Sequence, residues 1–490
     1  MIFYASGHLM HIRPGPKVVA VIAFCLKTGD IVMAEAIPTV EIDTWPEQTL
    51  RGHRIPGDRY TSSEFAQKEW EGMWTKVWLL LGRESEIPNH GDWQREEVGP
   101  ESILMVRQKD GGVKAFYNVC QHRGNPLVDE AKGTVKRFVC KYHSWAFMPD
   151  GELNFAPDSD DFAEGNPCGK VNLEELACET FAGFVWVNMD KDCVSLKEYL
   201  GPIWEDWTRY DIGSWKRTNA KQQNLPCNWK VVLDNFNESY HVPTVHMGAT
   251  PKTDRKKKVN LNTYFKETKF DLSNEGHNRM VMESGYGNGS VDKKTGKVLE
   301  PLASMLRHWE LDPDDFVNDP EATRGAVQEA KRRLGPERGY EHYARIPDQA
   351  LTDAFHYTLF PNFAVSLWSD GFHFLRARPH PTDPEQCIFD NWWYTSQPEH
   401  DPNAVKMGLG SGSQYDKENE EAELEITDYG DGDIGPGINQ DVEVFVRQQR
   451  GFRSRGFKGV YLSNQEGRIR RYHELIDDYI EGNPPKAHRK

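Results

Sequence analysis

Two cysteines and two histidines alternate within a short stretch of this chain. Cys120 and His122 form the first pair and Cys140 and His143 the second, with the spacing C-x-H-x17-C-x2-H. Each pair follows a predicted strand, so two loops can face each other and enclose a [2Fe–2S] cluster. Two thiolates would hold one iron and two neutral imidazoles the other, which raises the reduction potential above that of plant-type ferredoxins. These residues therefore predict a one-electron carrier.

Structural zinc is the alternative for the same four residues. Zinc motifs usually pair Cys with Cys and His with His, whereas the two types alternate here, which favours the cluster. A zinc-stabilised binding protein would be colourless, so a coloured protein would exclude it. A pure electron carrier is a further alternative, but it would not need the second motif.

The second motif contains two histidines and several carboxylates between residues 228 and 246. His241 and His246 are five residues apart, and on an unbroken helix they would point about 140° apart. Pro243 is expected to break the helix, so that both imidazoles can turn to one metal. Two His and one carboxylate on one face of Fe(II) leave positions open for O₂ and substrate.

Together the motifs resemble the Rieske ring-hydroxylating oxygenases. The matching segments are Gly91-Asp92-Trp93, Asn118-Val119-Cys120, His122-Arg123-Gly124, Tyr142-His143-Ser144-Trp145, and the tail E-x-Y-H-x4-H ending at His246. The family commonly has Pro where Lys141 stands and Gly where Ser144 stands. The resemblance implies the catalytic (alpha) subunit of a non-haem iron oxygenase.

The resemblance also implies the metal ligands. Cys120, His122, Cys140 and His143 carry over as cluster ligands, and His241 and His246 as ligands of the mononuclear Fe(II). The family's third iron ligand lies far downstream, at the start of a helix. Asp441 fits it best, with Asp431, Asp433 and Glu443 as competitors.

A carboxylate near His241 is expected to link the two metals. Glu238 lies one helical turn before His241, so it can accept a hydrogen bond from the second imidazole nitrogen. In the family, a carboxylate here also reaches a cluster histidine of the neighbouring subunit, which by resemblance is His143. Asp234 is the competitor, and Asn235 beside it is a further candidate catalytic residue.

The elements that position these residues can be read from local patterns. One predicted helix starts at Ser62 or Ser63. Others cover 229–240, 320–334, a stretch from near Asn439, and 466–480. Predicted strands are 77–81, 102–107, 113–117, 135–139, 183–189, 355–359, 363–368, 372–378 and 387–393, and residues 417–433 read as a loop. Asp110-Gly111-Gly112 is a strong hairpin signal.

We therefore expect an α+β fold. An antiparallel β Rieske domain precedes a larger catalytic domain, for which the resemblance implies a curved antiparallel sheet with helices of the helix-grip kind. The expected boundaries are 1–45 for an N-terminal extension that can be disordered, 46–75 for a helical lead-in packing on the catalytic domain, 76–190 for the Rieske domain, and 191–490 for the catalytic domain.

Composition excludes several classes of function. The 490 residues carry a net charge of −16, which disfavours binding to nucleic acid or anionic lipid. Eight cysteines are too few for a disulfide scaffold and fit a reducing compartment, so we expect a cytoplasmic protein. The apolar run 18–26 is too short to span a membrane.

Substrate and partners follow mainly from the resemblance. It implies electrons from NAD(P)H through a ferredoxin or flavin reductase, and a homotrimer with or without small β subunits. The leading substrate is a hydrophobic aromatic or polycyclic compound, as in aromatic hydrocarbon catabolism. The alternative is oxidative demethylation or C–N cleavage of a quaternary amine, which the Asp234–Glu238 spacing favours.

Three groups of residues bear on these partners. The first comprises aromatic residues expected mostly in a core and partly around a pocket: Phe355, Tyr357, Phe360, Phe363, Trp368, Phe372 and Phe374. Arg376 and Arg378 could hold a substrate carboxylate, although a structural role is favoured. The basic residues Arg123, Lys132, Lys136, Arg137 and Lys141 could dock an acidic electron donor.

Overall fold

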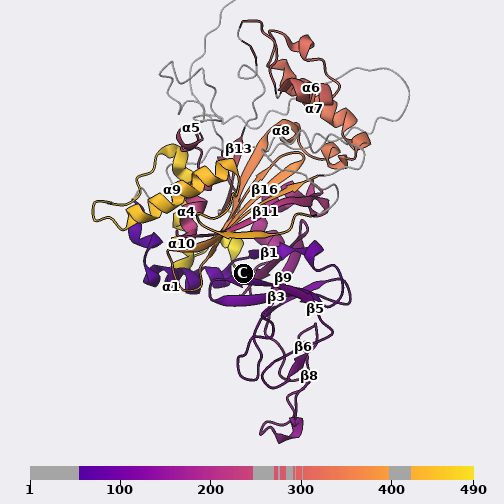
Figure 1. The fold of residues 1–490 in the computed structure, drawn as a ribbon, viewed down its shortest axis with the longest axis vertical. Helices are drawn as coiled ribbons and strands as arrows, with labels where there is room; N and C mark the ends of the chain where they lie inside the picture. The colour runs from indigo at the N-terminus through magenta and orange to yellow at the C-terminus, as the bar shows by residue number, and fades with distance from the viewer. Residues whose placement is uncertain are drawn as a thin grey trace, which may run out of the picture. The chain divides into compact units, whose positions relative to one another are not determined.

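The computed structural model describes residues 54–246, 270–273, 276–282, 291–292, 294–300, 302–396 and 421–490. Over these ranges the chain folds as α+β, as the sequence predicts (Figure 1). None of the helices in these ranges is both long and apolar enough to cross a membrane. The expected extension over 1–45 lies outside the described residues.

The N-terminal half builds an antiparallel sheet with the order β1-β10-β9-β4-β3-β2-β5. Its strands are β1 (Leu79–Arg83), β2 (Asp92–Val98), β3 (Glu101–Arg107), β4 (Val113–Tyr117), β5 (Lys132–Thr134), β9 (Glu175–Phe181) and β10 (Phe184–Asn188). β3 and β4 form the predicted hairpin, with Arg107 opposite Val113. A three-stranded sheet carries β6 (Phe138–Val139), β7 (Ala146–Phe147) and β8 (Leu153–Phe155), so the predicted strand 135–139 is shorter than expected.

A larger sheet forms the second half, with the order β12-β13-β14-β15-β16-β17-β11-β18 in the described residues. Its strands are β11 (Lys216–Leu225), β12 (Phe270–Ser273), β13 (His277–Met282), β14 (Ala354–Leu359), β15 (Phe363–Leu367), β16 (Gly371–Pro379), β17 (Cys387–Thr395) and β18 (Glu425–Asp428). Neighbours are antiparallel except β18, which runs parallel to β11. β18 lies inside 417–433, so the described part of that predicted loop contains an edge strand.

Helices cover and connect these sheets. They are α1 (Ser63–Gly72), α2 (Leu196–Leu200), α3 (Pro202–Thr208), α4 (Trp229–Phe236), α5 (Val242–Val245), α6 (Leu302–His308), α7 (Ala322–Leu334), α8 (Asp348–Thr352), α9 (Pro436–Phe452) and α10 (Gly467–Ile480). Ser62 caps α1 through its side chain, as predicted. The buried ion pair Lys230–Glu69 (2.8 Å) ties α1 to α4, which carries the second motif.

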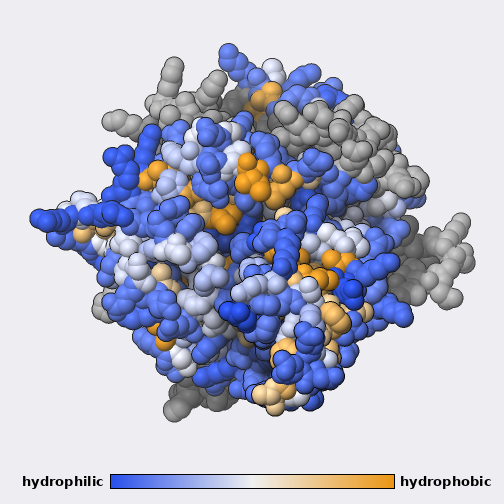
Figure 2. Space-filling view, turned by 60° about the horizontal axis from the view of Figure 1, so that its bottom comes forward, coloured by the Kyte–Doolittle hydropathy of each residue, from blue (hydrophilic) through white to orange (hydrophobic). Residues whose placement is uncertain are grey.

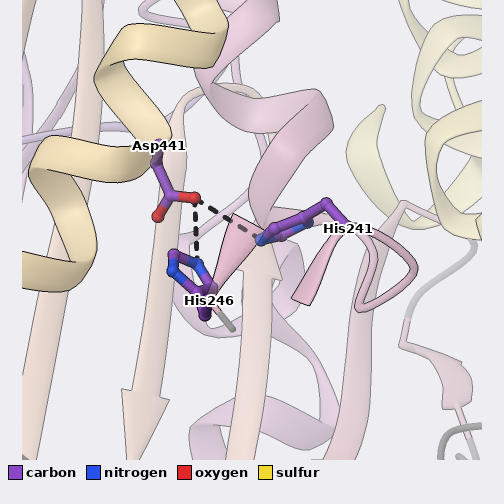
Figure 3. A group of neighbouring side chains, drawn as sticks. All are labelled: His241, His246 and Asp441. Atoms are coloured by element: carbon purple, nitrogen blue, oxygen red, sulfur yellow. Dashed lines mark ion pairs between the residues drawn. The ribbon is translucent and has the colours of Figure 1, made fainter. Parts of the chain in front are cut away.

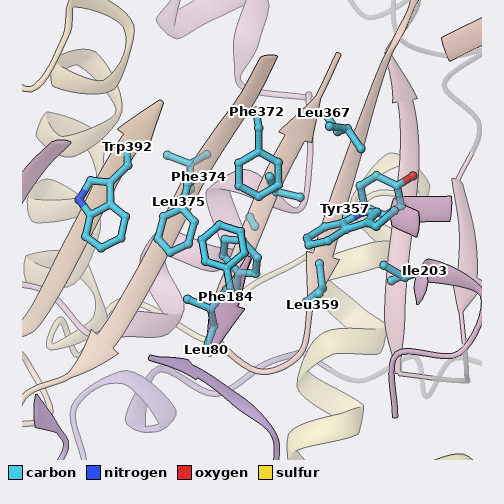
Figure 4. Packing of buried hydrophobic residues seen from close by; sticks show 14 of the residues in the cluster. Leu80, Phe184, Ile203, Tyr357, Leu359, Leu367, Phe372, Phe374, Leu375 and Trp392 are labelled. Atoms are coloured by element: carbon cyan, nitrogen blue, oxygen red, sulfur yellow. The ribbon is translucent and has the colours of Figure 1, made fainter. Parts of the chain in front are cut away.

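Strand alternation decides which side chains fill the core. On β16, Phe372 and Phe374 point to one face of the sheet, where they pack near Phe184 of β10 (Figure 4). The intervening residue His373 points to the opposite face, against Trp393. The large sheet thus has one face toward the β1/β10 side and the other toward α4 and α9.

The surface is mainly polar. With the lower end of Figure 1 turned forward, hydrophilic residues dominate and hydrophobic patches lie between them (Figure 2). Among the exposed apolar side chains are Val139, Tyr142 and Phe155, which belong to or adjoin the strands around the second Cys–His loop.

Candidate metal centres

The two Cys–His loops share one backbone pattern. The Cys120 carbonyl accepts the N–H of Gly124 (3.0 Å), and the Cys140 carbonyl accepts the N–H of Ser144 (3.0 Å). Each cysteine N–H donates five residues ahead, to Asn125 and Trp145. Gly124 and Ser144 both have positive φ, +73° and +60°. The structure therefore builds one tight turn twice, with a Cys at its start.

These turns bring the four predicted cluster ligands together. Cys120 and Cys140 are buried, and the rings of His122 and His143 lie with their centroids 4.6 Å apart. Burial raises the pKa of the Cys120 thiol to about 11, and a hydrogen bond with Cys140 adds to this. His122 Nδ1 is buried without a hydrogen-bond partner among the described residues. Iron would use the thiolates and this orphaned nitrogen, so the residues fit a [2Fe–2S] cluster.

The ammonium group of Lys141, one of the predicted docking residues, is paired with two acidic side chains. It lies 2.9 Å from Asp129 and 3.7 Å from Glu130. Arg123 lies over the ring of Tyr142, 5.1 Å from its centroid. Part of the positive charge expected around the cluster is therefore balanced by acids from the facing loop.

The second motif folds differently from the prediction. The expected helix 229–240 ends at Phe236, and Pro243 does not break it but lies in the first turn of α5. His241 and His246 are the cap residues at the two ends of α5. A single helical turn between them, rather than a kinked long helix, turns both rings to one side.

Asp441 reaches these rings from α9. Gly435, with φ +113°, and Pro436 start this helix, because proline suits its first turn. Asp441 is 3% exposed, and its side chain points at both histidines (Figure 3). Among the competitors, Asp433 accepts bonds from Gly435 and Asn439, and Glu443 pairs with Arg447 at the surface.

The three side chains converge on one point. Asp441 Oδ1 lies 3.1 Å from His246 Nε2 and 3.5 Å from His241 Nε2, and one possible ligand atom from each residue lies within 4.8 Å of the others. His241 Nδ1 is 2.6 Å from Glu238 Oε1, and His246 Nδ1 is 2.8 Å from Gln440 Oε1. Both partners are acceptors, so the neutral form of each ring is the tautomer that carries its proton on Nδ1.

Lone pairs on both Nε2 atoms and on Asp441 Oδ1 therefore face each other. That buried oxygen receives no hydrogen bond from the described residues. A proton on His246 Nε2 could be donated in a hydrogen bond to the Asp441 carboxylate 3.1 Å away, and this interaction raises the pKa of His246. A cation fits this arrangement, and two His plus one carboxylate is a donor set that suits Fe(II).

Glu238 and Asp234 have different surroundings. Glu238 accepts from the His241 backbone N–H (3.0 Å) as well as contacting its ring. Asp234 instead accepts from Tyr60 Oη (2.6 Å) and lies 3.0 Å from His473 Nε2. Asn235 is buried, and its Nδ2 has no acceptor among the described residues. Of the three, Glu238 is the residue that forms a hydrogen bond with a candidate iron ligand.

Two further polar residues lie beside the elements of this site, and the sequence does not single them out. Asn237 is fully buried at the end of α4, and its Oδ1 accepts from Thr358 (2.9 Å), which docks the helix end on β14. Gln440 contacts His246. An amide at a helix end and a polar residue beside a ligand are too common to be singled out from sequence alone.

The aromatic residues on the large sheet divide between its two faces. Most pack in the core through contacts with β10, α3 or α10: Tyr357, Phe360, Phe363, Phe372 and Phe374. Trp368 is half-buried and stacks on Trp393, on the His373 side. Arg376 and Arg378 both pair with buried Asp390, at 2.7 and 3.1 Å, so their role is structural, as favoured.

Comparison with known families adds to this geometry. Residues 77–172 match the Rieske [2Fe–2S] domain, and residues 212–482 match the ring hydroxylating alpha subunit (catalytic domain). The chain belongs to the ring-hydroxylating alpha subunits. A Rieske domain and this catalytic domain imply a [2Fe–2S] cluster and a mononuclear iron that works with O₂.

Curated relatives of this family have different names. The chain is 35% identical over 203 residues to the large oxygenase component of the naphthalene 1,2-dioxygenase system of Pseudomonas aeruginosa, covering 40% of this chain and 44% of that protein. It is 34% identical over 197 residues to the carnitine monooxygenase oxygenase subunit of Escherichia coli K12, covering 40% and 52%. The chain thus spans about half the length of these two relatives.

Solved structures show the same fold. A quaternary ammonium Rieske monooxygenase matches with a TM-score of 0.58 at 20% identity, over 87% of this chain and 94% of that one. Naphthalene 1,2-dioxygenase from Rhodococcus sp., bound to indole, matches with a TM-score of 0.60 at 19% identity, over 88% and 95%. Both known structures therefore share the architecture of this alpha subunit.

Proposed function

We propose that this chain is the terminal component of an oxygenase that uses electrons from NAD(P)H to insert oxygen from O₂ into an organic substrate. A ferredoxin or flavin reductase would supply the electrons, and the reaction would take place in the cytoplasm. The observation that carries this proposal is the convergence of His241, His246 and Asp441, in a chain that also holds a Rieske pair of loops.

The chain's residues would have distinct roles. Cys120 and Cys140 would hold one iron of the cluster, and His122 and His143 the other. His241, His246 and Asp441 would hold Fe(II), which supplies the site for O₂ activation when bound. Hydroxylation of one C–H bond consumes one O₂, two electrons and two protons and releases one water, whereas dihydroxylation places both oxygen atoms in the product.

Glu238 would connect the two centres. Its carboxylate fixes the tautomer of His241 through Nδ1. In a head-to-tail homotrimer, it would also face His143 of a neighbouring copy, so that each cluster serves the next iron. Inter-subunit electron transfer is named for the related quaternary ammonium monooxygenase, which supports this arrangement.

The metal content tests this function directly. We expect about three irons and two acid-labile sulfides per chain, with a red-brown Rieske spectrum, from one [2Fe–2S] cluster and one mononuclear site. Zinc without colour would overturn the proposal. Two irons that stay at two after Fe(II) is added would leave the cluster and remove the oxygenase function.

For the substrate, we propose a hydrophobic aromatic or polycyclic compound. Trp368, His373 and Trp393 form a half-buried aromatic platform, with His373 stacked on Trp393 at 4.0 Å. Burial lowers the pKa of His373 to about 4, against smaller opposing effects of Asn391 and Asp441, so the platform is neutral. Asn391, which contacts His373 (2.6 Å), also donates to the Ile434 carbonyl just before α9, the helix that carries Asp441. A planar ring can stack on such a surface.

A quaternary amine is the second candidate. The carnitine monooxygenase relative supports it, and so does the Asp234–Glu238 spacing. The aromatic platform could also hold a cation. Substrate depletion coupled to product formation, with a polycyclic hydrocarbon and a trimethylammonium compound in parallel, separates the two: consumption of only the ammonium compound would reverse the ranking.

A further inference from the structure

The two candidate histidine ligands are held by different kinds of group. His241 Nδ1 lies 2.6 Å from a carboxylate oxygen of Glu238, whose side chain is 9% exposed. His246 Nδ1 lies 2.8 Å from the amide oxygen of Gln440, which is exposed. One ring is thus supported by a buried charge and the other by a neutral surface side chain.

Gln440 also has an unusual place in the chain. It stands directly before Asp441 on α9, so adjacent residues of one helix supply a candidate ligand and the support of a second ligand. Its side chain has no other polar partner in the ranges that the structure describes. Nothing in the core depends on it, because it lies at the surface.

We propose that Gln440 is a positioning residue for the mononuclear metal, an inference that rests on the proposed function. Its amide oxygen accepts a hydrogen bond from His246 Nδ1–H, which keeps the ring proton on Nδ1 and leaves Nε2 free to bind metal. It also fixes the rotation of the ring, so that Nε2 faces Asp441 Oδ1 at 3.1 Å. A movement of α9 would therefore shift Asp441 and the His246 support together.

The surface position makes a clean substitution possible. Leu has nearly the same helix propensity as Gln, so Gln440→Leu removes the acceptor with little cost to α9. Gln440→Glu keeps an acceptor oxygen at the same reach and should restore binding. Glu443→Leu is the matched control, because Glu443 is exposed on the same helix and contacts Arg447 rather than a histidine.

The test measures Fe(II) binding rather than turnover. The full-length protein, with its cluster intact, is freed of mononuclear iron by a chelator and titrated anaerobically with Fe(II) by equilibrium dialysis. We expect Gln440→Leu to raise the dissociation constant about 10- to 100-fold, the usual effect of losing a ligand's hydrogen-bond partner. Gln440→Glu and Glu443→Leu should stay close to the unmodified protein.

Two controls separate the possible failures. Cluster absorbance and the unfolding midpoint of the iron-depleted protein should be the same for all variants. Gln440→Leu binding Fe(II) within twofold of the unmodified protein would overturn the positioning role alone. If the unmodified protein with an intact cluster took up no Fe(II), the proposed function would fail, and the role of Gln440 with it.

Discussion

The two candidate metal centres are built in opposite ways. The four candidate cluster ligands lie between residues 120 and 143, on two turns whose backbone hydrogen bonds stay within each loop. The three candidate iron ligands come from the ends of α5 and from α9, between residues 241 and 441. A local site needs only its own turns, whereas a distant one needs every contact that docks α9 and α4 on the large sheet.

The difference also concerns how each site is stabilised. The cluster site relies on buried thiols and backbone bonds, with conformational strain at Ser144. The iron site relies on side chains that hold other side chains, such as Glu238 on His241 and Asn237 on Thr358. Single substitutions should therefore affect the two centres separately.

The largest expected effect follows from removing Asp441, the candidate iron ligand that lies about 200 residues after the two histidines. We expect Asp441→Ala to remove the mononuclear iron and lower turnover by more than about 100-fold, beyond what loss of an outer hydrogen-bond partner usually causes. The cluster should remain, because its two turns are held by backbone hydrogen bonds within each loop. Iron and sulfide analysis with a turnover assay checks both.

Glu443→Ala is the control for that substitution. Glu443 is an acid of the same helix but pairs with Arg447 at the surface, so its loss should leave iron content and turnover unchanged. Loss of iron in Glu443→Ala but not in Asp441→Ala would mean that Glu443, and not Asp441, is the iron ligand.

A smaller effect is expected where the two centres are proposed to meet. Glu238→Gln keeps an oxygen that can accept from His241 Nδ1 but removes the charge. We expect both metals to stay bound while turnover coupled to product falls about 10- to 100-fold. Near-normal coupled turnover would show that the carboxylate does not link the centres.

Asp234→Asn provides the contrast to Glu238→Gln. Asp234 bonds to Tyr60 and His473 away from the histidine pair, so its substitution should lower the free energy of unfolding, by about 1–3 kcal/mol. Coupling of electrons to product should be retained. Chemical denaturation and the coupled assay distinguish these roles.

The same contrast explains what the sequence could predict. The cluster residues follow from spacing, because a turn with Cys at its start is encoded by its own residues. Asp441 follows only from the resemblance, since no local pattern shows which acid α9 brings to His246. The sequence pattern does not mark the end of α4 at Phe236, because the next residue, Asn237, is held by Thr358 of β14, far along the chain.

The alternation of side chains along the strands predicts the large sheet, but it does not predict which residues lie near the candidate iron site. Strands β14 to β17 lie close to the expected ranges, and the large rings of β16 alternate with His373 as period two requires. Which face meets the iron site depends on where α4 and α9 pack. The platform of Trp368, His373 and Trp393 could therefore be recognised only in three dimensions.

The smallest predicted effect compares the two cluster turns with each other. Gly124 and Ser144 occupy equivalent positions with positive φ, which costs a non-glycine residue about 1–2 kcal/mol. Ser144→Gly removes this strain. Glycine also increases the conformational entropy of the unfolded chain, which lowers the free energy of unfolding by about 0.4–1 kcal/mol. Relief of the strain outweighs the added entropy, so we expect a net stabilisation of about 0.5–1 kcal/mol.

The reciprocal variant tests whether the two turns are equivalent. A side chain at Gly124 would meet no atom within 4 Å, so Gly124→Ser should be destabilising by a similar amount through φ alone. Cluster absorbance followed during denaturation reports both changes. Opposite shifts of the midpoint support one shared turn, whereas destabilisation by both substitutions would mean that the Ser144 side chain makes a contribution larger than its strain.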